Sequence, residues 1–299
     1  MVGYATAPQV LRQVYPVQSS RKHFNVDVVF VHGLDGDSVS TWTKDETFWP
    51  RDLLPKSPFY QDARIFTFGY NREAFLNPNC KSKVRTFTCG ESLLNDLDDA
   101  RSTSPNRPII FIGHSLGGIV IKYALKHAKS RSQFANLLKS THAIIFFSTP
   151  HQGTHVQAWN AFFASLGKAD LQEVEVVEEL KQWSDMLAEL TSEFGELAPA
   201  FQMTTFYEFE ETNGVLVVPE GSARMGQQTE RLRGLNANHT NICKFTEADG
   251  NWLAVSRRLE AIAQNIGLLE SVAVSGPPTN PTPCEDDLAR RLRRLQKLQ

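Results

Sequence analysis

The chain contains 299 residues, with 31 Lys and Arg residues against 33 Asp and Glu residues, and its formal net charge is −2. Hydrophobic residues make up 41% and charged residues 21% of the sequence, and these values exclude a chain that is disordered, collagen-like or coiled-coil throughout. The balanced charge argues against a nucleic-acid-binding protein, which needs a basic surface.

No segment has the pattern of a membrane-spanning helix or a secretory signal. Met1–Val17 is interrupted by polar residues, and no run approaches about 18 consecutive apolar residues. The four cysteines lack the C-x-x-C spacing of zinc and redox sites. We therefore expect a soluble cytoplasmic protein that needs no metal or organic cofactor, and keep association with a membrane or organelle surface as an alternative.

Short apolar runs alternate with stretches of helical periodicity. The predicted strands are 26–31, 63–70, 108–113, 141–148, 204–209 and 215–218, and the predicted helices are 91–101, 117–129 and 252–266. The central strands are continuously apolar, as expected for parallel strands that are covered on both faces. This alternation predicts a doubly wound, mostly parallel α/β sheet in one domain over residues 24–268, preceded by an N-terminal extension over residues 1–23.

Residues 151–203 interrupt the alternation of strands and helices. Apolar residues recur at three- or four-residue steps from Val174 to Phe194, which predicts helices. The insertion is either an ordinary pair of packed helices or a lid over a site, because long insertions in compact domains are often functional. The sequence leaves both interpretations open.

Two segments of distinct composition follow the predicted domain. Residues 269–284 form a Pro-rich linker, and residues 285–299 predict a basic amphipathic helix with leucines along one stripe. Four interpretations of this helix stay open: a solvated helix, a helix that binds a protein partner, the start of a further domain, and a helix that touches an anionic membrane surface.

The segment Gly113-His114-Ser115-Leu116-Gly117 matches the G-x-S-x-G pattern of a nucleophile elbow. It follows a predicted buried strand and opens a predicted helix, which is the context that the elbow requires. Gly113 and Gly117 are small enough for the tight turn, which projects the Ser115 hydroxyl out of the sheet. We therefore predict that Ser115 is a nucleophile.

A serine that transfers an acyl group also needs backbone amides to stabilise the charge that develops on the carbonyl oxygen. The first donor is the amide of Leu116, directly after the nucleophile. The second is expected in the loop after an earlier strand, where Gly33 and Gly36 let the backbone approach closely and Leu34 supplies the amide. We expect the backbone of this loop to matter more than the side chains at positions 32 and 34.

The base is expected late in the sequence, because the order in α/β-hydrolases is serine, acid, histidine. His151 and His155 come directly after the fourth strand, ahead of any suitable acid. His239 lies in a loop between the last strand and the terminal helix, where the base belongs. We predict that His239 is the base.

The acid is expected at the strand that follows the insertion. Glu208 and Glu210 lie in and beside the aromatic segment FYEFEE of this strand. A carboxylate within an aromatic strand is costly unless it is paired, and an N–H of His239 would supply the partner. We predict that Glu208 is the acid, with Glu210 as the alternative and Glu220 as a weaker candidate.

Several sequence blocks resemble one lineage of α/β-hydrolases. The blocks are VFVHGLDGDSVSTWT at 29–43, WPRDLLP at 49–55, ARIFTFGYN at 63–71, RPIIFIGHSLGGIVIKYAL at 107–125, FFSTPHQGTH at 146–155 and NHTNICKF at 238–245. Over about residues 24–268 the chain resembles the serine-active-site-containing, lipase-like family related to the GPI inositol-deacylases. It also resembles the N-terminal domains of fungal NLR-like (NACHT or NB-ARC) proteins.

The resemblance implies an α/β-hydrolase fold with Ser115 as nucleophile, His239 as base and an acid in the FYE segment, which supports Glu208. It also implies lipid or ester substrates, which the residues themselves do not show. In the fungal receptors a nucleotide-binding domain would follow, but this chain lacks the G-x-x-x-x-G-K-[ST] motif.

These observations together predict a serine hydrolase that cleaves carboxylic esters, lipid-like ones above all, through an acyl-enzyme intermediate. The alternative is a non-catalytic or conditionally active effector or signalling domain of an NLR-like immune protein. The presence of Ser115 and His239 weighs against this alternative without excluding it. Peptidase or thioesterase activity through the same residues is a third interpretation.

Overall fold

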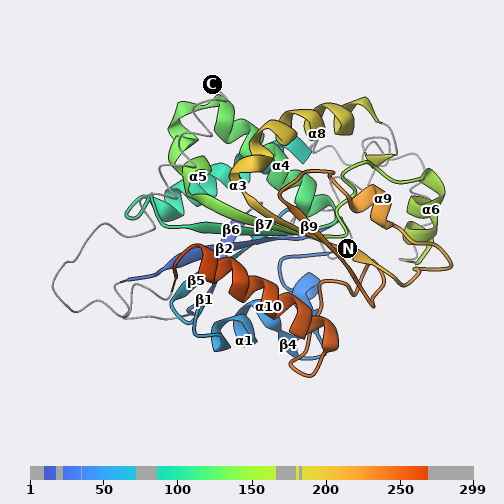
Figure 1. The fold of residues 1–299 in the computed structure, drawn as a ribbon, viewed down its shortest axis with the longest axis horizontal. Coiled ribbons are helices and arrows are strands. Elements are labelled where there is room, and N and C mark those ends of the chain that lie inside the picture. Colours follow the sequence, from blue (N-terminus) through green and yellow to red (C-terminus); the bar gives the residue numbers. More distant parts are fainter. Residues whose placement is uncertain are drawn as a thin grey trace, which may run out of the picture.

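The computed structural model describes residues 10–17, 23–34, 36–71, 86–165, 180–181 and 184–268. These residues form a seven-stranded sheet that runs across the middle of the molecule (Figure 1). Its strands are β1 (Val10–Tyr15), β2 (Val26–Val31), β5 (Ala63–Gly69), β6 (Ile109–His114), β7 (Thr141–Phe147), β8 (Gln202–Glu208) and β9 (Glu230–Leu235). Their order is β1-β5-β2-β6-β7-β8-β9, with β1 antiparallel to β5 and all other neighbours parallel. A separate hairpin pairs β3 (Thr43–Lys44) with β4 (Thr47–Phe48).

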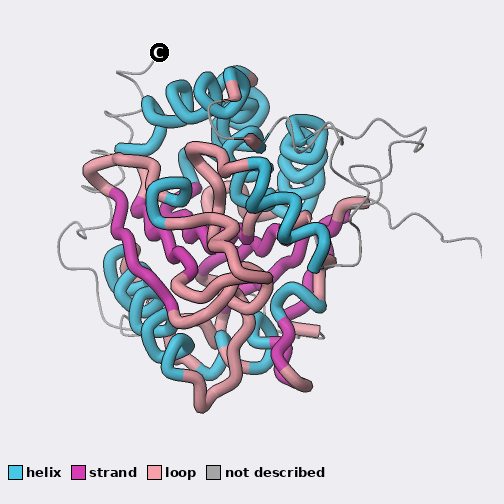
Figure 2. The backbone as a smooth tube through the Cα atoms, turned by 90° about the vertical axis from the view of Figure 1, so that its right-hand side faces the viewer, coloured by secondary structure: helices cyan, strands magenta, loops and turns pink. Residues whose placement is uncertain are grey.

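Helices cover both faces of the sheet, and Figure 2 shows the strands between the two helical layers. One face carries α3 (Thr86–Arg101), α4 (Leu116–Ser130), α5 (Ala135–Ser140) and α8 (Asp185–Leu197) (Figure 1). The other face carries α1 (Trp49–Asp52) and α10 (Gly250–Asn265), while α6 (Val156–Ser165) and α9 (Glu220–Ala223) lie at one end of the molecule (Figure 1). Short 3-10 turns occur at Ser40–Trp42, Leu54–Lys56, Ser132–Phe134 and Ala198–Ala200.

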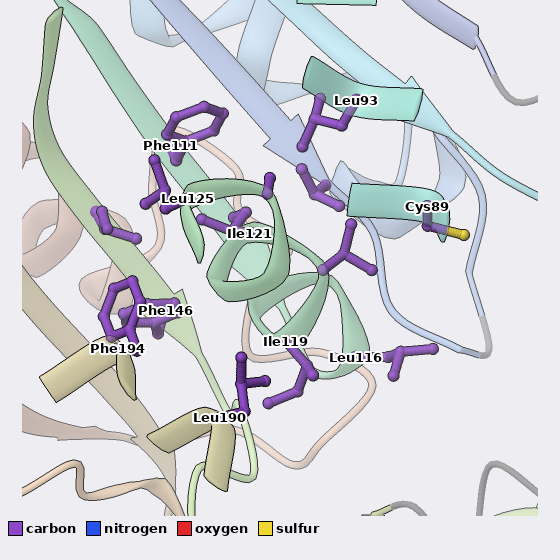
Figure 3. Close-up of a cluster of buried hydrophobic side chains, with 14 of the residues drawn as sticks. Cys89, Leu93, Phe111, Leu116, Ile119, Ile121, Leu125, Phe146, Leu190 and Phe194 are labelled. Carbon is purple, nitrogen blue, oxygen red and sulfur yellow. The ribbon is translucent and has the colours of Figure 1, made fainter. Parts of the chain in front are cut away.

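The apolar strands explain why both faces are covered. Every residue of β2 and β6 is buried, and successive side chains point to opposite faces. Val29 joins the cluster under α3 and α4, whereas Phe30 packs edge-on against Trp42 on the opposite face at 5.0 Å between ring centroids. Figure 3 shows part of the first cluster, in which Ile119 of α4 lies near Leu190 of α8. The predicted doubly wound, mostly parallel sheet is therefore confirmed.

Two predicted features of the sheet differ from the structure. Residues 10–15, which we placed in the N-terminal extension, form β1 and pair with β5, so the sheet begins before residue 24. The run 215–218 forms a loop rather than a strand. Its only strand-like pairing among the described residues is an isolated antiparallel β-bridge between Thr212 and Val215. The last strand is instead β9, an edge strand that carries Glu230, Arg231 and Arg233 and exposes both arginines.

The predicted helices 91–101, 117–129 and 252–266 correspond to α3, α4 and α10. Within the predicted insertion the structure describes α6, α8 and short connecting segments, while residues 166–179 and 182–183 lie outside the described residues. The predicted linker over 269–284 and the predicted helix over 285–299 also lie outside them. Among the helices of the described part, none has the length and hydropathy to cross a bilayer.

Candidate active site

Ser115 occupies a sharp turn between β6 and α4. Its backbone angles are φ 50° and ψ −123°, a conformation that residues other than glycine rarely adopt. A Cβ at Gly117 would lie 2.1 Å from the Val31 carbonyl oxygen, and one at Gly113 would lie 2.8 Å from the Cα of Gly118. The two glycines of the motif therefore let α4 begin directly against the end of β2.

The structure brings Ser115, His239 and Glu208 together in one hydrogen-bonded chain. Ser115 Oγ lies 3.0 Å from His239 Nε2, and His239 Nδ1 lies 2.8 Å from Glu208 Oε2. An ionised carboxylate only accepts, so Nδ1 donates to Glu208 and Nε2 presents its lone pair to the Ser115 hydroxyl. The three residues come from the turn after β6, the loop after β9 and the last position of β8, all at the carboxyl edge of the sheet.

Glu208 is 1% exposed, so its charge requires compensating contacts. Its Oε1 accepts a 2.9 Å hydrogen bond from the Val218 amide, while Oε2 accepts from His239. Burial by itself raises the pKa of the Glu208 carboxyl, but the charge and hydrogen bond of His239, with the Val218 amide, lower it below the ordinary value of 4.5. Glu208 is therefore ionised at neutral pH and holds the Nδ1 proton of His239 in place.

The other residues considered for the acid and the base lie elsewhere. Glu210 is exposed beyond the end of β8, and Glu220 forms an ion pair at the surface. His151 is buried and packs edge-on against an aromatic ring of the hydrophobic core. His155 is exposed just before α6. The register of β8 places Glu208, rather than Glu210, against His239.

Both segments expected to supply the oxyanion amides adjoin Ser115 in the structure. Leu116 is the first residue of α4, so its amide belongs to the positive end of the helix dipole. Gly33 packs directly against the elbow, because a Cβ there would lie 2.8 Å from Ser115 Cβ. The turn that carries the Leu34 amide is therefore in contact with Ser115.

The His32 side chain fixes this turn. The Tyr70 amide donates to His32 Nε2 at 3.1 Å, so Nδ1 carries the ring proton and donates to the Gly33 carbonyl oxygen at 2.7 Å. Because the C=O and N–H of one trans peptide point in opposite directions, this bond orients the Leu34 amide as well. The side chain at position 32 therefore contributes to the loop through the backbone geometry that it holds.

Helix α6 covers the imidazole ring of His239. Phe162 and Trp159 approach this ring edge-on, at 5.1 Å and 6.2 Å between ring centroids. Ser115 is 1% exposed and His239 is 0% exposed beneath this cover. These two aromatic rings and the imidazole of His239 thus form one buried cluster next to Ser115.

Sequence reasoning missed the roles of His32, Val218 and the aromatic residues of α6. The spacing of Trp159 and Phe162 indicates an apolar helix face, but the sequence does not show what that face contacts. The sequence predicts a strand over 215–218, whereas Val218 lies in a loop and its amide donates to Glu208. His32 stands beside Gly33 in the predicted oxyanion loop, and this adjacency was the one available signal.

The sequence of the chain matches one protein family and several known proteins. Residues 19–184 match the family described as "Putative serine esterase (DUF676)". Protein SERAC1 of Bos taurus is 28% identical over 262 residues, covering 79% of this chain and 38% of the relative. The GPI inositol-deacylase of Candida albicans is 26% identical over 131 residues, covering 42% of this chain and 31% of the relative. The chain thus spans about two fifths or less of the length of these relatives.

The mature form of the Bacillus licheniformis lipase BlEst2 has a similar structure, with a TM-score of 0.60 and 18% identity. The similarity covers 86% of this chain and 99% of the lipase, and it shows that the two share the α/β-hydrolase fold. Because the family match covers more than half of the sequence, the chain belongs to the DUF676 family, which is described as putative serine esterases.

Proposed function

We propose that the chain hydrolyses carboxylic esters and that Ser115, His239 and Glu208 act as nucleophile, base and acid. The observation that supports this most directly is the continuous hydrogen-bonded chain from Ser115 Oγ through the His239 ring to Glu208 Oε2. The three side chains are within hydrogen-bond distance in the order that a nucleophile, its base and an orienting acid require. The family description agrees with this chemistry.

In the first half-reaction, His239 Nε2 takes the proton of Ser115 Oγ as this oxygen attacks the carbonyl carbon of the ester. An electron pair moves onto the carbonyl oxygen, and the amides of Leu116 and Leu34 stabilise the oxyanion near the positive end of α4. The tetrahedral intermediate then collapses. The bond to the alcohol oxygen breaks, and the alcohol leaves with the proton that His239 holds.

In the second half-reaction, water attacks the acyl group on Ser115. His239 Nε2 takes a proton from the water as its oxygen bonds to the acyl carbon, and the bond to Ser115 Oγ then breaks. Ser115 recovers its proton from His239, and the carboxylic acid is released. Glu208 stays ionised throughout and stabilises the imidazolium form of His239. The complete cycle consumes one water molecule for each ester that is hydrolysed.

The aromatic residues of α6 support substrates with an apolar acyl chain. An acyl group bound to Ser115 lies close to Phe162 and Trp159, because both rings contact the imidazole that touches Ser115. An alkyl chain replaces these ring contacts without burying polar groups, whereas a peptide backbone would bury unpaired N–H and C=O groups there. We therefore propose lipid-like esters as substrates, and the name of the deacylase relative, which denotes removal of an acyl group, agrees.

The test is turnover of p-nitrophenyl esters of increasing acyl length, beside a peptide p-nitroanilide and an acyl thioester. We expect ester hydrolysis that rises from acetate to medium-length chains and exceeds the other two reactions. Ser115→Ala and His239→Gln should each lower kcat by about 10⁴- to 10⁶-fold. Faster cleavage of the anilide or the thioester would reassign the substrate, and a folded chain that cleaves none of the three would refute the function.

A further inference from the structure

The residue that precedes Ser115 makes a contact outside the hydrogen-bonded chain of the site. His114 is the last residue of β6 and is 1% exposed. Its Nε2 lies 2.9 Å from the main-chain carbonyl oxygen of His239, and the two imidazole rings are 5.1 Å apart between centroids. A carbonyl oxygen only accepts, so the His114 Nε2–H donates this bond.

Packing leaves the His114 ring little freedom to move. Its main chain pairs with Phe147 of β7 within the sheet. On another side it meets Gly33, where an added Cβ would lie 2.8 Å from His114 Nδ1 and 3.1 Å from its carbonyl oxygen. The donor is therefore held by the rigid sheet, whereas its acceptor, His239, belongs to a turn outside the strands and helices.

We propose that His114 is a positioning residue that fixes the main chain of His239 and thereby the distance from its ring to Ser115. The neighbouring residues 114 and 115 contact His239 at two points, one at its carbonyl oxygen and one at its ring nitrogen. The hydrogen bond to Glu208 sets the rotation of the His239 ring. That rotation directs Nε2 at Ser115 Oγ only if the Cα of His239 is also held at the right position. The inference rests on the proposed function, in which His239 is the base.

The kinetic test compares His114→Leu, which removes the donor, with His114→Gln, whose side-chain amide reaches the same carbonyl. Rates are expressed per active site titrated with a fluorophosphonate, so that a loss of folded protein does not enter kcat. His114→Leu should lower kcat by about 10- to 100-fold with little change in KM, because a small displacement of the base costs rate rather than binding. His114→Gln should keep most of the rate, and the control His127→Leu, on α4, should match the wild type.

A second readout does not depend on turnover. With ¹⁵N-labelled histidine, the proton between His239 Nδ1 and Glu208 should give a low-field NMR resonance in the wild type and in His114→Gln. In His114→Leu this resonance should broaden or disappear, because the ring is no longer held against the carboxylate.

The outcomes separate the two proposals. A wild type that gives the resonance but cleaves no ester would refute the proposed function. The positioning role would then be judged from the resonance alone: its loss in His114→Leu would support the role, and its persistence would overturn it. Unchanged kcat and an unchanged resonance in His114→Leu would overturn the role of His114. Equal losses in the Leu and Gln variants would also overturn it, because packing rather than the hydrogen bond would then be responsible.

Discussion

Glu208 shows how a single residue of the site is specified by its surroundings. A carboxylate at the end of an aromatic strand is unfavourable in isolation, and here two hydrogen bonds, from His239 and from the Val218 amide, keep it charged. Glu210, two residues further on, is exposed to solvent and lacks this enclosure. The difference between the two residues lies in their surroundings rather than in their chemistry.

Glu208→Gln should therefore lower kcat by about 10³- to 10⁴-fold, because an amide no longer stabilises the imidazolium form of His239. Glu210→Gln should keep the wild-type rate. Steady-state hydrolysis of a p-nitrophenyl ester, with circular dichroism to check the fold, distinguishes the two variants. The reverse pattern would show that the acid is Glu210.

Position 117 requires glycine because the main chain of β2 leaves no room for a side chain there. Gly117→Ala would place a methyl group 2.1 Å from the Val31 carbonyl oxygen and 2.5 Å from that of His32, and neither main-chain atom can move freely. The variant should lose about 3 kcal/mol of unfolding free energy, at the upper end of overpacking effects. Gly221→Ala in α9 is the matched control, since no atom lies within 4 Å of the added Cβ. Urea unfolding measures both, and equal stability of the two variants would contradict this packing.

Helix α6 packs against the ring of the proposed base. Its aromatic side chains Trp159 and Phe162 lie against the ring of His239. The same side chains belong to the hydrophobic core, so the lid and the ordinary packed helix pair both stay predictions for the insertion. An acyl chain that enters the site must take the place of some of these ring contacts.

Phe162→Ala should change selectivity for acyl length. With the ring removed, the site loses apolar contact with long chains, while short esters gain access to Ser115. The ratio of kcat/KM for p-nitrophenyl octanoate to that for acetate should fall by about tenfold or more. Leu253→Ala, at an exposed position of α10, serves as the control and should keep the wild-type ratio. An unchanged ratio in Phe162→Ala would show that the acyl chain does not contact α6.

The elements differ in how far the sequence could predict them. Buried strands such as β2 and β6 are continuously apolar, and the strand–turn–helix context of Ser115 is local, so both were predictable. Edge strand β9 carries charged residues and lacks the apolar run by which the other strands were predicted. The contacts of His32 with Tyr70 and of Phe162 with His239 join distant segments, and a single sequence carries no record of such pairings.

For the molecule as a whole, the buried Lys122 links α4, the helix that follows Ser115, to α8. Lys122 Nζ, on α4, donates to Thr191 Oγ1 of α8 at 2.8 Å, and this hydroxyl donates to the His151 carbonyl oxygen at 2.9 Å. Burial lowers the pKa of Lys122 to about 7, although the charge of Glu230 partly opposes it. The same burial, with the Lys122 charge, lowers the pKa of His151 well below 6.5.

This lowered pKa makes the stability of the molecule depend on pH. Between pH 7 and pH 10.5 the unfolded chain binds a proton at Lys122 that the folded chain does not, so the free energy of unfolding should rise with pH. The rise corresponds to about 1.4 kcal/mol for each unit of pKa difference. Below pH 7 both states are protonated at Lys122, and its unfavourable contribution is constant.

Lys122→Met should remove this part of the pH dependence and raise stability at pH 7. Lys126→Met, on the same helix but in a surface ion pair with Glu193, should leave the dependence in place. Urea unfolding at several pH values from 7 to 10 measures the three proteins. Parallel pH profiles for the wild type and Lys122→Met would contradict the buried, weakly basic lysine.

The most direct test of Ser115 as the nucleophile is covalent labelling with a fluorophosphonate, followed by mass spectrometry of the digested protein. The structure predicts one equivalent of adduct on the peptide that contains Ser115, with none in Ser115→Ala and strongly slowed labelling in His239→Gln. Adduct on a different residue, or a folded wild-type chain that takes up no label, would contradict the assignment of Ser115 as the nucleophile.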